Sequence, residues 1–98
     1  MAYSAQSKQY KFYSDPGHGW LEVTTADLAD VGLHRGDFSR YSYQSGNNGT
    51  ATLIYLEEDC DAPRFIAAFR STYSEEPTII ERNDGAFIRN LRHLVEAR

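Results

Sequence analysis

Apolar and aromatic residues fall into short runs along the chain, and turn residues separate these runs. Residues 9–14 (QYKFYS) and 19–24 (GWLEVT) are rich in aromatic and β-branched side chains, with Asp, Pro and Gly between them. This pattern predicts a β-hairpin. Polar and apolar positions alternate in residues 37–44 (DFSRYSYQ), and the turn signal SGNNG leads into residues 50–58 (TATLIYLEE), which predicts a second hairpin.

Two other segments have the spacing of amphipathic helices. Thr25 is the expected N-cap of a short helix that ends at Gly32. Asp61 at the N-cap and Pro63 in the first turn open a longer helix, which runs to about Thr72. The apolar residues of this second helix form one stripe, which we expect to be the main helical contribution to the core: Phe65, Ile66, Phe69 and Tyr73.

The C-terminal third predicts one more strand over residues 77–83 (PTIIERN). Residues 86–98 form either a last helix, favoured by the spacing of Ile88, Leu91 and Val95, or an irregular tail. The expected fold is therefore α+β, with a mainly antiparallel sheet in the order β-β-α-β-β-α-β and helices on one face.

Length and composition indicate one folded domain over residues 1–98, with residues 1–8 as a polar, loosely held start. Hydrophobic residues make up 41% of the chain, enough for a core. The N-terminus lacks the apolar stretch of a signal peptide, and no run is long enough to cross a membrane. We therefore expect a cytoplasmic protein with no membrane partner. Cys60 is the only cysteine, which excludes an intrachain disulfide, and we expect a small buried thiol.

The charge distribution suggests the kind of partner. Fourteen acidic and ten basic residues give a net charge of -4, which argues against direct binding to nucleic acid and allows a basic partner. Four carboxylates fall within the five residues 57–61 (EEDCD), at the predicted junction of a strand and a helix. Such carboxylates suit Mg²⁺ or Ca²⁺, but the spacing does not fit an EF-hand loop. A capped junction with an exposed acidic patch explains them better.

His18 lies in the loop of the first predicted hairpin, close to Asp15, and this pair could act as a base or a metal ligand. A metal site needs three or four convergent ligands, however, and His34 and His93 stand alone in the sequence. Turn geometry and core packing account for the other residues of the loop, Trp20 included. We therefore favour a turn that presents His18 for binding or packing.

Tyr41 and Tyr43 form an aromatic face on a predicted strand. Such faces stack on single-stranded nucleic acid in some modules, but those modules have basic neighbours, and Arg40 is the only one here. A protein interface is the better interpretation. No phosphate loop, nucleophile elbow or zinc spacing occurs in the sequence. We expect no enzymatic activity, no cofactor and no metal.

Two stretches, SDPGHGWLEV (residues 14–23) and YLEEDCDAPRF (residues 55–65), with SRYSYQ between them, resemble a group of small proteins encoded by phages, plasmids and other mobile elements of proteobacteria. The resemblance covers about residues 10–94 and brings no catalytic residues with it. It implies a context, since such proteins are often inhibitors of host defence, anti-CRISPR proteins among them.

These observations predict a non-enzymatic protein that binds a host protein or ribonucleoprotein complex, such as a CRISPR effector, and blocks it in the cytoplasm of the host cell. One alternative is a small metal-dependent enzyme or regulator that uses His18 and the carboxylates of residues 57–61. Another is a generic adaptor or homodimer that binds through an exposed strand edge. The residues predicted to bind the partner are acidic or aromatic, with one histidine: Glu57, Glu58, Asp59, Asp61, His18, Trp20, Tyr41 and Tyr43.

Overall fold

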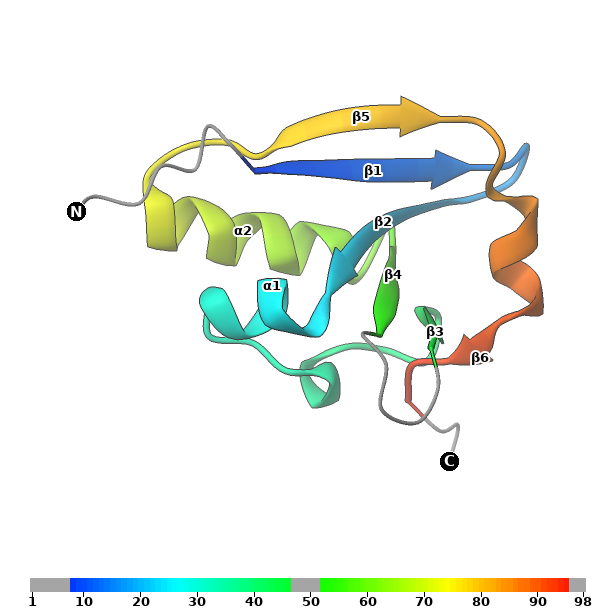
Figure 1. The fold of residues 1–98 in the computed structure, drawn as a ribbon, viewed down its shortest axis with the longest axis horizontal. Helices are drawn as coiled ribbons and strands as arrows, with labels where there is room; N and C mark the ends of the chain where they lie inside the picture. Colours follow the sequence, from blue (N-terminus) through cyan, green and yellow to red (C-terminus); the bar gives the residue numbers. More distant parts are fainter. Residues whose placement is uncertain (1–7, 47–51, 96–98) are drawn as a thin grey trace.

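The computed structural model describes residues 8–46 and 52–95, which form a six-stranded sheet with helices packed against it (Figure 1). The strands are β1 (Gln9–Ser14), β2 (Gly19–Thr24), β3 (Tyr43–Ser45), β4 (Leu53–Glu57), β5 (Thr78–Arg82) and β6 (Arg92–His93). The α-helices are α1 (Thr25–Asp30) and α2 (Ala62–Tyr73), and two 3-10 helices are η2 (Arg35–Asp37) and η3 (Gly85–Asn90). In the described residues, no helix is long and apolar enough to span a membrane.

The α+β class is confirmed, but the prediction of a mainly antiparallel sheet in the stated order needs correction. The sheet is mixed, with the strand order β5-β1-β2-β4-β3-β6, and β5 pairs in parallel with β1. The crossover through α2 explains this direction, because the helix carries the chain back along the sheet before β5 begins (Figure 1). The sequence pattern of β5 contained no information about which strand it would join.

The first hairpin forms as predicted, with Phe12 opposite Leu21 and Ser14 opposite Gly19. The backbone N–H of Asp15 closes the loop on the carbonyl of His18, at 2.9 Å. A Cβ at Gly19 would lie 2.3 Å from the Phe12 ring, so this strand start has room only for glycine. In the second hairpin, most of the predicted SGNNG turn lies outside the described residues.

The strand predicted over residues 37–44 is mostly absent. Residues 35–37 form η2, and pairing with β4 begins only at Tyr43. A side chain from a distant part of the chain accounts for the difference. The Asp61 carboxylate accepts hydrogen bonds from the Ser39 backbone N–H at 3.0 Å, from the Ser39 hydroxyl at 2.7 Å and from the Ser42 hydroxyl. These bonds hold the segment in a loop instead of a strand.

Both predicted helices form, with small differences at their starts. The N-cap of α1 is Thr24, one residue before the predicted Thr25, because Thr24 and Asp27 form a reciprocal capping box. Gly32 follows α1 with a φ of 81°, which favours glycine. Asp61 is the N-cap residue of α2 as expected, but its side chain caps nothing, since it is turned to Ser39 and Ser42.

The two α-helices lie on the same side of β1 and β2 (Figure 1). The α2 stripe is confirmed as core, since Phe65 and Phe69 are fully buried. Both rings make T-shaped contacts with Tyr10, at centroid distances of 5.3 and 6.0 Å. Leu28 of α1 joins the same cluster. This face of the sheet therefore packs against the two helices.

The opposite face carries a second, smaller cluster formed by Tyr13, Trp20, Tyr55 and Ile88. Ile88 belongs to η3. The segment from residue 86, predicted to be either a last helix or an irregular tail, is a 3-10 helix followed by the short strand β6. Figure 1 shows this segment, in orange, at the end of the molecule where the β1–β2 loop also lies. The functional candidates gather on this second face.

Asp61 is the polar residue on which the loop before β3 depends, so its charge should matter for stability. For Asp61→Asn, we expect a loss of at least about 2 kcal/mol in the free energy of unfolding. The Ser39 N–H and the Ser39 and Ser42 hydroxyls would then face a side-chain amide, whose NH₂ group donates and cannot accept. Asp59→Asn, at an exposed neighbouring position, should change it by less than about 0.5 kcal/mol. Urea unfolding followed by circular dichroism measures both. Equal stability of the two variants would contradict this role.

Candidate functional site

A cavity of about 400 Å³ opens on the second face of the sheet. Four separate parts of the chain build it: the start of β2, the segment leading into β3, the turn after β4, and η3. Pairing of Trp20 with Glu57, and of Tyr43 with Tyr55, brings the first three parts together. The lining residues are His18, Trp20, Tyr41, Tyr43, Glu57, Asp59, Cys60 and Arg89.

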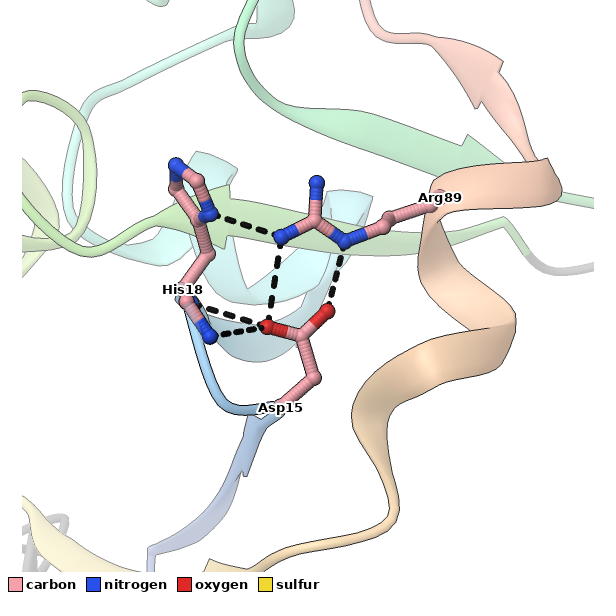
Figure 2. Close-up of polar contacts among 4 residues, drawn as sticks. Asp15, His18 and Arg89 are labelled. Carbon is pink, nitrogen blue, oxygen red and sulfur yellow. Dashed lines mark hydrogen bonds and ion pairs between the residues drawn. The ribbon is translucent and has the colours of Figure 1, made fainter.

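An ion pair between Asp15 and Arg89 joins the β1–β2 loop to η3 (Figure 2). The Arg89 Nε donates to Asp15 Oδ2 at 2.5 Å, and a terminal guanidinium nitrogen donates to Oδ1 at 3.2 Å. Oδ1 also accepts the backbone N–H groups of Gly17 and His18, at 2.9 and 2.8 Å. The Asp15 side chain is only 8% exposed. One carboxylate thus fixes both the loop and the arginine.

Arg89 in turn fixes the His18 ring. The guanidinium nitrogen that reaches Asp15 also lies 2.7 Å from His18 Nδ1 (Figure 2). Since a guanidinium only donates, Nδ1 is the acceptor and the imidazole proton is on Nε2. The ring stacks on Trp20, with 6.0 Å between centroids, and the guanidinium lies 5.4 Å from the Trp20 ring centre. The three side chains form one layered wall of the cavity.

The titration of this pair follows from the contacts. The Arg89 hydrogen bonds, supported by the backbone N–H groups of Gly17 and His18, hold the pKa of the Asp15 carboxyl well below its ordinary value of 3.8. The same hydrogen bond to Asp15 raises the pKa of Arg89. Both groups are therefore charged throughout the physiological range.

Trp20 contributes a polar group without a partner. The residue is 2% exposed, and its indole Nε1 is the one buried side-chain polar atom of the described residues that forms no hydrogen bond. An unpaired buried donor costs about 1 to 3 kcal/mol.

The acidic side of the cavity is the turn after β4. The Glu57 carboxylate accepts the backbone N–H groups of Asp59 and Cys60, at 3.0 and 2.9 Å, which fixes the turn. Glu58 and Asp59 are exposed. Within residues 8–46 and 52–95, none of these three carboxylates forms an ion pair. Glu57 is 7% exposed, and the turn itself uses both of its carboxylate oxygens, so Asp59 is the exposed carboxylate of the three that lines the cavity.

Cys60 is exposed, so the prediction of a buried thiol is wrong. Cys60 lies in the turn after β4 and lines the cavity. Partial desolvation, followed by the charge and hydrogen bond of Glu57 and by the charges of Asp61 and Asp59, raises the pKa of the thiol. A raised pKa keeps the group protonated at neutral pH, which is unfavourable for a nucleophile.

Six of the eight residues predicted to bind a partner line this cavity, while Glu58 and Asp61 do not. Glu58 borders a separate groove on the helical side, with Phe12, Ile66 and Ile79 among its neighbours. Glu57 is 7% exposed, so the exposed acidic patch that the sequence predicted is reduced to Glu58 and Asp59. Asp61, which is 3% exposed, does not belong to it either. Its carboxylate is turned inward because Ser39 and Ser42 saturate it.

Sequence reasoning missed Arg89 as a member of the site. Its contact with Asp15 spans 74 positions in the sequence. The residues around Arg89 show only the apolar spacing of Ile88, Leu91 and Val95, which predicts a helix and no ion pair. The charge of Asp15, unexplained by its turn bonds alone, was the available signal, but it does not identify which of ten basic residues would pair with it.

In the part of the chain that the structure describes, no group of three His, Cys, Asp or Glu side chains is placed to hold a metal ion. Comparisons of the chain with protein families, with curated proteins and with solved structures found no match. The geometry of the site is therefore the basis for its interpretation.

The Asp15–Arg89 pair should give the protein a characteristic pH dependence. Because the pKa of Asp15 is lower in the folded chain than in the unfolded chain, the pair stabilises the fold above the ordinary pKa of 3.8, and this stabilisation is lost as the pH falls below that value. We expect the melting temperature of the natural chain to exceed that of Asp15→Asn by a constant amount at neutral pH, and the difference to shrink below about pH 4.

Thermal unfolding at a series of pH values measures this difference. Arg89→Gln should show the same loss of pH dependence, because it removes the partner that lowers the Asp15 pKa. A melting-temperature difference that stays unchanged down to about pH 2.5 would contradict the assignment.

Proposed function

We propose that this protein is a non-enzymatic binding protein that inhibits a host nucleic-acid-processing complex by occupying a basic surface on it. The observation that carries the proposal is the acidic turn of residues 57–59. Its carboxylates form no ion pair within residues 8–46 and 52–95, and Glu57 and Asp59 line the aromatic cavity. Nucleic-acid-binding surfaces are rich in Lys and Arg, and opposite charge steers such a surface to the acidic turn. The exposed ring of Tyr41 adds an aromatic contact of the kind enriched at interfaces.

The polar groups in the cavity support binding more than catalysis. The Nδ1 atom of His18 is occupied by Arg89, and Nε2 carries the proton, so the ring has no free basic nitrogen in this arrangement. The Cys60 thiol has a raised pKa. Neither side chain is prepared to attack or deprotonate a substrate.

The resemblance to mobile-element proteins decides which complexes to test first. Purified CRISPR effector complexes, immobilised without nucleic acid, should retain the protein, and target DNA should compete with it. Asp59→Asn should weaken retention by about threefold to tenfold, because charged contacts across such interfaces contribute on the order of 1 kcal/mol.

Glu75→Gln is the matched control, since it removes the same charge from an exposed position in the turn after α2, outside the cavity. It should leave retention unchanged. No retention by any effector complex, or equal effects of the two substitutions, would overturn the proposed function.

A further inference from the structure

The cavity presents two kinds of polar group to a ligand, in addition to its aromatic walls. Acceptors come from the carboxylates of Glu57 and Asp59. A donor comes from the His18 Nε2–H, which the Arg89 contact fixes in its protonated form. Trp20 also lines the cavity, with its indole N–H buried and without an acceptor. A ligand that satisfies the site must therefore both donate and accept.

The charges in the cavity favour a cation. Arg89 lies in the wall, but the bidentate contact with Asp15 compensates it. Glu57 and Asp59 have no such partner among residues 8–46 and 52–95. The local balance is therefore negative, and a bound cation would meet both carboxylates at one side of the cavity.

The shape of the walls favours a planar cation over a compact one. Tyr41 and Tyr43 supply flat aromatic surfaces beside the Trp20 ring, which is 2% exposed and already in contact with His18 and Arg89. The protein already stacks guanidinium groups on two of these rings, with Arg89 5.4 Å from the Trp20 centroid and Arg40 5.5 Å from that of Tyr41. A guanidinium combines such stacking with paired hydrogen bonds to carboxylates, whereas an ammonium is a compact point charge.

We propose that the cavity binds one arginine in an extended segment of the partner protein. The guanidinium meets Glu57 and Asp59, and a main-chain carbonyl of the same segment accepts from His18. This inference rests on the proposed function and names the group that is captured: an arginine that would otherwise contact nucleic-acid phosphate.

Trp20 makes the inference directly measurable, because it is the only tryptophan in the chain. The protein therefore has a single indole N–H signal in a proton–nitrogen NMR spectrum. Three capped pentapeptides serve as probes, each with one central residue among glycines: arginine, lysine, or citrulline, which keeps the shape of arginine without its charge. The arginine peptide should move the indole signal in a saturable manner. The lysine and citrulline peptides should bind at least about tenfold more weakly.

Two variants locate the binding. Asp59→Asn should weaken the arginine peptide by about tenfold, and Glu75→Gln should not change its binding. Equal effects of these substitutions would place the peptide elsewhere on the surface and overturn the inference. Guanosine is a further probe, because a guanine base also combines a flat ring with donor and acceptor edges. An indole shift with guanosine and none with the arginine peptide would make the cavity a nucleobase site and overturn the inference.

The outcomes separate this inference from the proposed function. Equal binding of the lysine and arginine peptides would overturn the preference for arginine. It would still agree with the proposed function, in which the protein binds a basic surface of its partner. No shift with any peptide would exclude the cavity as the point of capture, while retention by effector complexes would still support the function. A saturable arginine shift without retention by any complex would uphold the site and remove the proposed inhibitor.

Discussion

The ion pair between Asp15 and Arg89 is the interaction on which the candidate site depends. It connects the first loop of the chain to a 3-10 helix near its end, and the same guanidinium orients His18 against Trp20. Without it, the β1–β2 loop and η3 would have no charged contact between them in the described residues. The wall of the cavity thus depends on tertiary contacts: Asp15 fixes Arg89, and Arg89 fixes His18 against Trp20.

A second carboxylate, that of Asp61, holds a loop in place on the other side of the cavity. Asp61 anchors Ser39 and Ser42, and the Ser42 hydroxyl also accepts the backbone N–H of Glu57. This network sets the loop that ends at Tyr41 and Tyr43 against the acidic turn. Two buried or nearly buried acids therefore position the site, while the exposed acids around Asp59 are left to meet a ligand.

Local physical signals account for what the sequence could predict. The apolar stripe of α2, the glycine-bounded first hairpin and the α+β class all follow from the spacing of side chains within one segment. The parallel direction of β5, the loop before β3 and the partner of Asp15 each depend on contacts between distant segments, which spacing does not record. His18 and the acidic turn were both predicted to bind the partner, and they line one cavity, but Arg89, which fixes His18, had no local signature.

The protonation of the His18 ring tests this account most directly. Arg89 can only donate to Nδ1, so the neutral imidazole must carry its proton on Nε2. Long-range proton–nitrogen NMR of the imidazole groups, recorded at a mildly basic pH, distinguishes the two neutral forms. The account predicts an unprotonated Nδ1 for His18, and a change in this signal in Arg89→Gln. A proton on Nδ1, or a His18 signal that Arg89→Gln leaves unaltered, would contradict the wall of stacked side chains on which the cavity depends.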